Sequence, residues 1–400
     1  MADFSRAEAA VRAGLDAAYL DRLIELRILR PSVEDRLART DVRKAKVVET
    51  LEGAGIALEA IAAGIESGHL SLDFMDSPIY ERFATLGDET FRQLSQRTDL
   101  PLELLMLVRE AAGGAVPEPD DRVREDEALV VPHIQAQLAS GITARSVERL
   151  LRVLGDCLRR AAETESDAWR TDIMEPILAS GGVRELTETT RAEDTIANDR
   201  ATNEAILALW HAQQAQAWTA NIIGGFETGL TDAGLLSRPN RPPAICFLDI
   251  TGYTRLTHER GDAAAADLAT EMSRLVNRTA LERSGRPVKW LGDGVMVHFR
   301  DPGLGVLAAL EMVDGVGAVG LPPAHVGMHA GPVLFQEGDY FGRTVNLAAR
   351  IAEYARPGEV LVTQEVVEES ASSGATFTEV GPVELKGISG AVRLHVAHRS

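Results

Sequence analysis

The stretch Pro287–Phe299, PVKWLGDGVMVHF, restricts the possible folds of this chain more narrowly than any other, because it predicts two short strands around a tight turn. Asp293-Gly294 is typical of a two-residue hairpin turn, since both residues tolerate the positive φ that such a turn needs. After the turn, apolar residues alternate with Met296 and His298, which predicts one apolar strand face. Flanking glycines let a cation that carries a nucleotide triphosphate approach the Asp293 carboxylate. On this stretch alone, a purely structural turn is the simpler interpretation.

A proline-rich segment, Ser237–Pro243, separates two parts of the chain with different apolar periodicity. Three of its seven residues are proline, and such a segment does not continue a helix. Before it, apolar residues recur at intervals of three and four, which predicts helices. After it, short apolar runs alternate with helical patterns. We therefore expect an α+β protein: an all-α region followed, at residues 244–400, by an α/β sandwich of helices on a mostly antiparallel sheet.

The C-terminal part divides into predicted strands and helices of ordinary length. We predict strands at Ala244–Ile250, His325–Ala330 and Val360–Thr363 and within Val383–Val396, and helices at Ala263–Leu281, Pro302–Val319 and Arg343–Tyr354.

The N-terminal part predicts two helical regions, residues 1–112 and 127–236, joined by a linker rich in Gly, Pro and charge at Gly113–Glu127. Residues 21–68 have the pattern of a helix-turn-helix with its turn at Gly55-Ile56, similar to the DNA-binding head of MerR-type regulators. That segment holds eight Lys or Arg and nine Asp or Glu, so it lacks the basic stripe of a DNA-binding surface. Ala201–Leu230, with Trp210 and Trp218, is a candidate signal-transmitting helix before the last region.

Charge and composition exclude several classes of protein. The net charge of −19 argues against binding nucleic acid through bulk charge. Cys157 and Cys246 each lie in an apolar run, which predicts two buried thiols rather than a disulfide. The first residues lack the basic start and apolar core of a signal peptide. The most apolar stretch, Gly305–Pro323, is interrupted by Glu311 and Asp314, so we expect no membrane span and a cytoplasmic protein.

Polar residues at the ends of the predicted strands form a candidate nucleotide site. Asp249 ends the first strand, and the turn that follows it presents backbone N–H groups at a helix N-terminus, where phosphate binds. Asp249 and Asp293 are expected at neighbouring strand ends, where two carboxylates can hold a divalent pair. Asn346 and Arg350, four residues apart, share one helix face that suits a ribose and a phosphate.

Together these motifs resemble a class III nucleotidyl cyclase domain, and the match runs from about residue 244 to the end. They are FLDITGYT at Phe247–Thr254, KWLGDG at Lys289–Gly294, GDYFGRTVNLAAR at Gly338–Arg350 and ELKG at Glu384–Gly387. The resemblance implies a ferredoxin-like catalytic domain. The N-terminal two-thirds is similar to the helical regulatory halves of some soluble actinobacterial cyclases.

The resemblance also implies a role for each site residue. Two Mg²⁺ or Mn²⁺ ions per site would be held at Asp249 and Asp293, with Ile250 beside the first. Lys289 and Asp339 would select adenine, Asn346 would orient the ribose and Arg350 would stabilise the transition state. The triphosphate would lie near the turn Gly252, Tyr253 and Thr254 and near Lys386. The domain would be half of a head-to-tail homodimer, with the two aspartates of one protomer facing Lys289, Asp339, Asn346 and Arg350 of the other.

These roles predict an adenylyl cyclase that converts ATP to 3′,5′-cyclic AMP and pyrophosphate and is regulated by its helical N-terminal half. A guanylyl cyclase is the alternative within the enzyme class, although it would be expected to carry different residues at Lys289 and Asp339. A transcriptional regulator that only binds nucleotide is the alternative from another class. The sequence leaves the N-terminal input open among pH, a small hydrophobic molecule and a protein.

Overall fold

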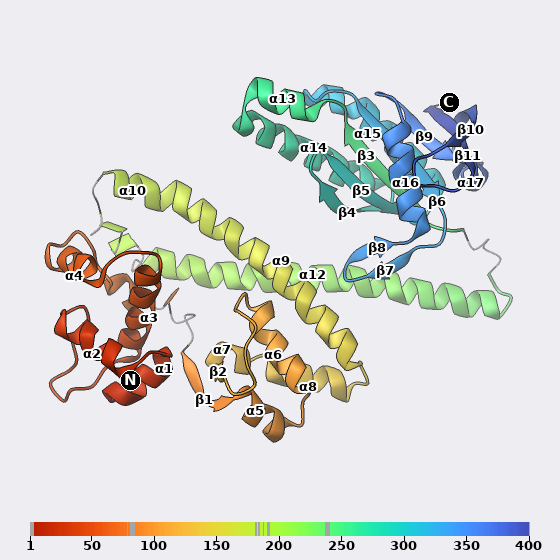
Figure 1. The fold of residues 1–400 in the computed structure, drawn as a ribbon. Coiled ribbons are helices and arrows are strands. Elements are labelled where there is room, and N and C mark those ends of the chain that lie inside the picture. Colours follow the sequence, from red (N-terminus) through yellow and green to blue (C-terminus); the bar gives the residue numbers. More distant parts are fainter. Residues whose placement is uncertain are drawn as a thin grey trace. The chain divides into compact units, whose positions relative to one another are not determined.

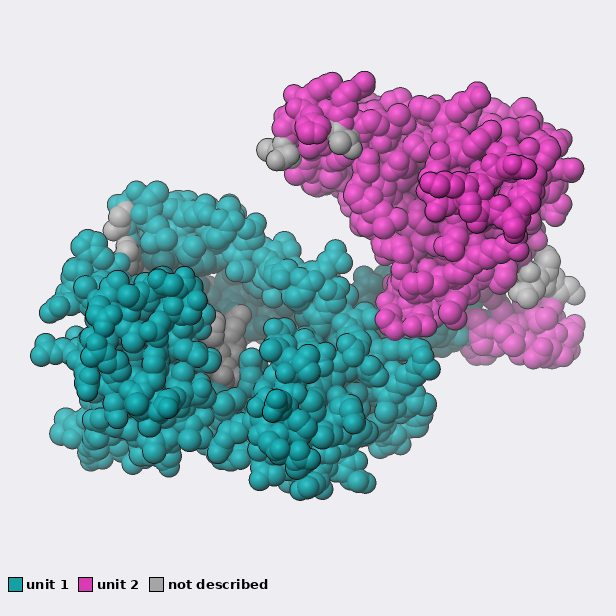
Figure 2. Space-filling view, in the orientation of Figure 1, with its two compact units in different colours: residues 1–223 teal, residues 224–400 magenta. Residues whose placement is uncertain are grey.

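The computed structural model describes residues 4–77, 79–80, 85–180, 182, 185–186, 188–189, 193–236 and 241–399. The chain separates into two compact units, residues 1–223 and 224–400 (Figures 1 and 2). The predicted break at Ser237–Pro243 falls mostly on residues 237–240, which lie outside the described residues.

Unit 1 begins with a cluster of short helices whose apolar faces pack together. They are α1 (Arg6–Ala13), α2 (Ala17–Glu25), α3 (Arg39–Gly53) and α4 (Leu58–Glu66), followed by the 3-10 turn η1 (Asp73–Asp76). Leu20, Leu23 and Val48 are fully buried in the core of this cluster. Gly55, with a φ of 95°, lies in the turn between α3 and α4 and adopts the left-handed conformation that glycine tolerates best.

The segment Gly113–Glu127 is not the linker that its composition predicted. It contains β2 (Arg122–Arg124), which pairs antiparallel with β1 (Leu86–Thr90). The Glu127 carboxylate, in α7 (Glu125–Ala128), accepts hydrogen bonds of 2.7 and 2.9 Å from Arg109 of α6 (Leu102–Ala111). The charged residues of this segment predicted that it would be exposed to solvent. Glu127 is nevertheless buried, because the positive charge of Arg109 neutralises its carboxylate. The N-terminal region is therefore helical with one small sheet rather than all-α.

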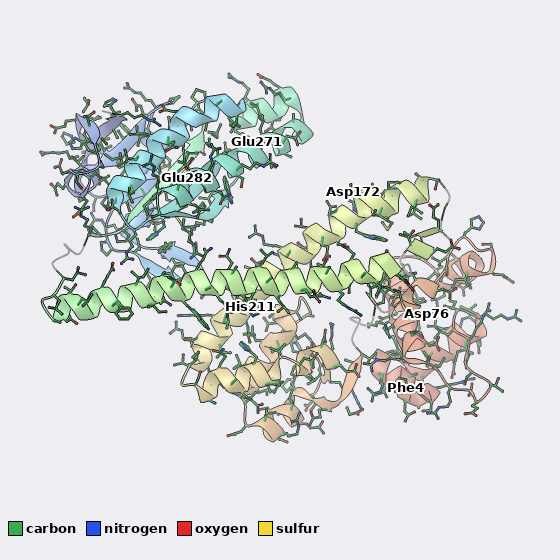
Figure 3. All side chains as sticks on the ribbon, turned by 180° about the vertical axis from the view of Figure 1, so that it is seen from behind. Phe4, Asp76, Asp172, His211, Glu271 and Glu282 are labelled. Carbon is green, nitrogen blue, oxygen red and sulfur yellow. The ribbon has the colours of Figure 1, made fainter. Side chains whose placement is uncertain are left out.

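The rest of unit 1 consists of helices, several of them long. They are α5 (Phe91–Thr98), α8 (Val131–Ala139), α9 (Ala144–Trp169), the π-helical turn η3 (Arg170–Met174), α10 (Glu175–Ala179) and α12 (Glu193–Asp232), whose last residues belong to unit 2. Cys157 is exposed on α9, so the prediction of a buried thiol was wrong there, because the apolar run around it covers only one helix face. α12 contains the predicted helix Ala201–Leu230, and its side chains project along its whole length, His211 among them (Figure 3).

Unit 2 is built on a seven-stranded sheet in the order β10-β11-β9-β6-β3-β5-β4. Its first elements are β3 (Ala244–Ile250), α13 (Tyr253–Arg260), α14 (Asp262–Glu282), β4 (Gly285–Leu291), β5 (Gly294–Phe299), α15 (Pro302–Gly315), the 3-10 turn η4 (Val316–Val319) and β6 (Ala324–Ala330). The strand order β6-β3-β5-β4 from this βαββαβ sequence confirms the ferredoxin-like prediction. The remaining elements are α16 (Arg343–Tyr354), β9 (Val360–Thr363), α17 (Gln364–Glu369), β10 (Ala375–Glu384) and β11 (Ala391–Arg399). All pairs in this sheet are antiparallel except β6 with β9.

Helices cover both faces of this sheet, because alternate residues of its central strands are buried on opposite sides. Cys246 and Leu248 of β3 lie in a core with α14 and α15, whereas Ile245 lies on the other face with Val345 and Ala348 of α16. One described helical stretch, Pro302–Val319, is long and apolar enough to cross a membrane by length and composition. It consists of α15 and η4, and most of the residues of α15 are buried in the core of this unit.

The hairpin that opened the sequence analysis is present, but its turn lies one residue earlier than predicted. Gly292 and Asp293 form the turn, Gly292 has a φ of 67°, and Gly294 already belongs to β5. Glycine is usual at the first position of a two-residue turn with positive φ there. Met296 is buried like Val295 and Val297, since helices cover both sheet faces. Two features were not predicted from the sequence: the hairpin of β7 (Leu334–Gln336) and β8 (Asp339–Phe341), and the start of β10 at Ala375.

Candidate active site

Strand register brings the two predicted metal-binding aspartates together at one end of the sheet. Asp249 of β3 lies opposite Gly294 of β5, and Asp293 immediately precedes Gly294 in the turn. A Cβ atom added at Gly294 would lie 2.9 Å from Oδ1 of Asp249 and 3.0 Å from the Leu248 carbonyl oxygen. Gly294 therefore leaves the space that the Asp249 carboxylate occupies, which is a local reason for glycine beside the hairpin turn.

The Asp249 carboxylate is destabilised as an anion. Burial raises its pKa first, and the nearby charge of Asp293 raises it further, while His325 and a backbone hydrogen bond from Ile250 act in the opposite direction. A divalent cation between Asp249 and Asp293 would relieve this repulsion, so the residues present fit the implied metal site. Among the described residues, no group of three or more His, Cys, Asp or Glu side chains could hold a metal ion. Two carboxylates alone match a Mg²⁺-type site that substrate phosphates complete.

His325 is a polar neighbour of the metal pair that the sequence analysis did not identify. Its Nε2 lies 3.7 Å from Oδ2 of Asp249, and its Nδ1 lies 3.2 Å from the hydroxyl oxygen of Thr251. His325 belongs to β6 and lies directly opposite Asp249 in the β3–β6 register. Only the antiparallel pairing of β3 and β6 identifies His325 as a neighbour of Asp249, because no single sequence motif contains both residues.

The turn for which the sequence predicts phosphate binding lies directly after β3. Gly252 has a φ of 75° and precedes α13, whose first residue is Tyr253. The Tyr253 hydroxyl donates to the carbonyl of Ala265 at 2.7 Å, so this side chain joins α13 to α14. Ile250 is buried, so its side chain is unlike the polar groups of this turn. The side chain of Thr254 lies outside the described residues.

The two predicted adenine-selecting side chains are in direct contact. Nζ of Lys289, on β4, donates to Oδ2 of Asp339, on β8, at 2.5 Å. The other oxygen, Oδ1, accepts the backbone N–H of Tyr340 at 2.7 Å. A charged donor and a charged acceptor are thus held side by side in one ion pair.

Asn346 and Arg350 lie on the outer face of α16, whose opposite face is buried against the sheet. Arg350 pairs with Glu353 of the same helix at 2.6 Å. Lys386 is exposed in the connection between β10 and β11, at the opposite edge of the sheet from β4. Among the described residues, no hydrogen bond or ion pair of Asn346, Arg350 or Lys386 reaches either the aspartate pair or the Lys289–Asp339 pair.

Two family models match this chain in separate ranges. Residues 237–398 match the adenylate and guanylate cyclase catalytic domain, and residues 29–201 match the adenylate cyclase regulatory domain. The chain is 31% identical over 253 residues to an uncharacterized protein of Mycobacterium tuberculosis, a match that covers 62% of this chain and 63% of that protein. The match thus spans less than two thirds of this relative.

Other relatives carry names. The chain is 28% identical to a pH-sensitive adenylate cyclase of Mycobacterium tuberculosis over 77% of both chains. It is 25% identical to an adenylate cyclase of Streptomyces coelicolor over 69% of this chain and 70% of that one. The crystal structure of the adenylyl cyclase CyaB from P. aeruginosa overlaps 40% of this chain and 95% of its own, at 24% identity and a TM-score of 0.36.

Residues 237–398 thus resemble a class III nucleotidyl cyclase domain in their match to the catalytic-domain model, in their ferredoxin-like sheet and in their paired aspartates. Ahead of this part, residues 29–201 are similar to the regulatory domain of adenylate cyclases. Proteins with this catalytic domain generally use divalent metal ions and act on nucleotides.

Proposed function

We propose that this protein is an adenylyl cyclase that converts ATP to 3′,5′-cyclic AMP and pyrophosphate. The contact between Lys289 and Asp339 is the observation that carries the proposal. Lys289 donates to N1 of adenine and Asp339 accepts from the exocyclic amine. Guanine reverses the hydrogen-bonding pattern at both positions, so it leaves two polar groups of the site unpaired.

The Asp249–Asp293 pair holds two Mg²⁺ or Mn²⁺ ions in this proposal. When bound, the ions neutralise the triphosphate and lower the pKa of the ribose 3′-hydroxyl. The two carboxylates supply the negative charge that orders them, and the N–H groups of the turn around Gly252 bind phosphate oxygens. The raised pKa of Asp249 supports this assignment, because a carboxylate destabilised as an anion gains most from a cation.

The remaining residues act on the ribose and on the α-phosphate. Asn346 orients the ribose so that its 3′-hydroxyl is aligned for in-line attack on the α-phosphorus. Arg350 then stabilises the charge that develops on the phosphoryl oxygens. For this, its ion pair with Glu353 must break. Lys386 lies near the polyphosphate.

The complete site forms between two chains in a head-to-tail homodimer. Asn346 and Arg350 lie on the face of α16 opposite to the one that packs on the sheet of their own chain, which supports this assignment. Asp249 and Asp293 of one protomer face Lys289, Asp339, Asn346 and Arg350 of its partner, and twofold symmetry then produces two equivalent sites.

The helical N-terminal half regulates this activity in the cytoplasm, and α12 leads from that half into the catalytic unit. The input is open, and the pH sensitivity named for one relative makes pH the first condition to vary.

Product analysis tests the proposal directly. Purified full-length protein is incubated with ATP or GTP in Mn²⁺ and in Mg²⁺, and the cyclic nucleotides are quantified. We expect cyclic AMP and pyrophosphate in equal amounts from ATP and much less cyclic GMP from GTP. A preference for GTP favours a guanylyl cyclase. Binding of ATP with no product, together with a retarded band on DNA, favours a nucleotide-sensing regulator.

A further inference from the structure

Asp339 lies on a hairpin that its own strands stabilise only weakly. β7 and β8 contain three residues each and pair with each other in a separate two-stranded sheet. A two-stranded hairpin is marginally stable in water by itself, so contacts outside the hairpin must fix its position. Leu334 and Phe335 of the hairpin are exposed, and Phe341 is half-exposed with its ring centroid 5.9 Å from Nζ of Lys289 on β4. Asp339 and Tyr340 make closer contacts with the main sheet.

The ring of Tyr340 provides a large apolar contact between the hairpin and the main sheet. It stacks on the imidazole of His298 in β5, with ring centroids 4.4 Å apart and an angle of 2° between the planes. Tyr340 also packs against the apolar cluster that contains Met296 and Val345. Phe335 of β7 lies against the same ring, at 5.0 Å between centroids, so Tyr340 joins both strands of the hairpin to the sheet.

This stack is coupled to the carboxylate through the backbone of Tyr340. The Tyr340 N–H donates to Oδ1 of Asp339 at 2.7 Å, while Lys289 donates to Oδ2 at 2.5 Å. Lys289 and His298 belong to the adjacent strands β4 and β5. Two consecutive residues of the hairpin are therefore bound by two neighbouring strands of the sheet, and both oxygens of the carboxylate are fixed.

His298 remains an uncharged flat ring in this position. Burial lowers its pKa to about 4, and the positive charge of Arg286 adds to the effect. Burial also raises the pKa of the Tyr340 phenol. Two neutral rings stack by dispersion and offset electrostatics, an interaction that another aromatic ring can reproduce and an aliphatic side chain cannot.

We propose that His298 and Tyr340 form a positioning pair that fixes the Asp339 carboxylate for selection of the purine base. This inference rests on the proposed adenylyl cyclase function. Neither ring touches the substrate; the pair acts through Asp339, which binds the base to the same extent in the ground state and in the transition state. Loss of the stack is therefore expected to raise KM with little change in kcat.

Leucine and phenylalanine variants separate stacking from simple space filling. In the full-length protein, His298→Leu and Tyr340→Leu are each expected to raise KM for ATP by roughly two- to tenfold, the range of an aromatic pair. The preference for ATP over GTP is expected to fall, and kcat at saturating ATP to stay within about twofold. His298→Phe and Tyr340→Phe keep a flat ring and are expected to behave like the wild type.

His398→Leu is the matched control, because His398 is an exposed histidine on β11, which lies far from β4 in the strand order. Hydrogen exchange at residues 339–341 provides a readout that needs no catalysis: faster exchange in His298→Leu, but not in His298→Phe or His398→Leu, is expected. Hydrogen exchange tests whether the His298–Tyr340 stack fixes the hairpin, whereas product analysis of the wild type tests the cyclase assignment. The two proposals can therefore fail independently. Unchanged KM, selectivity and exchange in a folded His298→Leu protein would overturn the proposal, as would equal defects in the Phe and Leu variants.

Discussion

The position of the Asp249 carboxylate favours metal binding but lowers the stability of the metal-free protein. It is partly buried, it faces the charge of Asp293, and Gly294 leaves the space for it. Sites that hold like charges close together are typical of function rather than stability. The side chain nevertheless remains 45% exposed, so water reduces the energetic penalty.

Asp249→Asn is expected to abolish cyclase activity and to raise Tm at neutral pH in the absence of divalent cations. The pKa of Asp249 is raised in the folded protein, so ionisation lowers stability as the pH rises through that value. The higher stability of the Asn variant, relative to the wild type, is therefore present at about pH 7.5. It disappears below about pH 4, the ordinary pKa of a carboxyl group. Because the side chain is half-exposed, we expect the free energy of unfolding to rise by less than about 1 kcal/mol. Thermal melting at the two pH values measures it, with the exposed Asp267→Asn as control; an unchanged or lower Tm at neutral pH contradicts the account.

In the proposed function, base selection depends on Lys289 and Asp339 acting as one unit. Lys289→Glu combined with Asp339→Ser should remove most ATP turnover, because each lost charge-assisted hydrogen bond costs roughly 1.5–3 kcal/mol. Activity with GTP is expected to rise relative to activity with ATP. Steady-state kinetics with both nucleotides provide the comparison. A double variant that keeps the wild-type preference for ATP shows that these two residues do not read the base.

At the scale of elements, the β1–β2 sheet and α7 depend on a buried ion pair. Only 1% of the Glu127 side chain and 14% of the Arg109 side chain are exposed, and the Arg109 guanidinium also lies over the Phe91 ring at 4.8 Å. Glu127→Ala leaves a largely buried guanidinium without its principal carboxylate, so we expect a loss of roughly 3 kcal/mol from unit 1.

The matched control for this prediction is Glu89→Ala, which removes the exposed Glu89–Arg97 pair and is expected to cost less than about 1 kcal/mol. Urea unfolding, monitored by a signal from unit 1, measures the free energy of unfolding of both variants. Equal effects of the two substitutions would show that Gly113–Glu127 contributes no more to stability than the surface does.

The sequence predicted those elements whose apolar pattern and boundaries are local. Arg343–Tyr354 and Val360–Thr363 have the predicted bounds, because glycine or threonine caps and buried apolar runs mark them. The β7–β8 hairpin was missed because its exposed aromatic side chains lack strand alternation. β2 was missed because its arginines predicted a solvated segment, and only its partner β1, more than 30 residues earlier, reveals a strand.

The candidate site followed the same rule. Spacing along one strand or helix placed Asp249 near its turn and Asn346 with Arg350. The contacts of His325 and His298 depend on the pairing of distant strands and on the position of a hairpin. No pattern in a single segment encodes those pairings, so they required the structure.

At the scale of the whole molecule, the two units have separate apolar cores, since the core clusters lie within residues 9–72, 91–151 and 244–397. α12 is the described helix that contains the boundary between the units. An element shared by two units can bias one of them according to the state of the other. This arrangement supports a regulatory role for the N-terminal half.

Deletion of residues 1–236 is therefore expected to change the turnover rate, or its dependence on pH, severalfold. Among the described residues, the main apolar core of unit 2 begins at Ala244, so this deletion removes none of its described members. Cyclic AMP formation across pH is compared for the two proteins at matched dimer fraction. Identical kinetics at every pH exclude regulation by the deleted half under those conditions.

The central claim is that one active site takes its aspartates from one chain and its Asn346 and Arg350 from another. Mixing two inactive variants tests it most directly. Asp249→Ala alone and Asn346→Ala with Arg350→Ala are each expected to be nearly inactive, because both sites of each homodimer are damaged. In the heterodimer, both lesions fall in one site and the other site is intact. Differently tagged chains are mixed, the heterodimer is isolated and its cyclic AMP formation is measured. The account predicts recovery of up to about half of the wild-type rate per dimer if the sites are independent. A confirmed heterodimer without recovered activity would contradict the shared site and favour a site built within one chain.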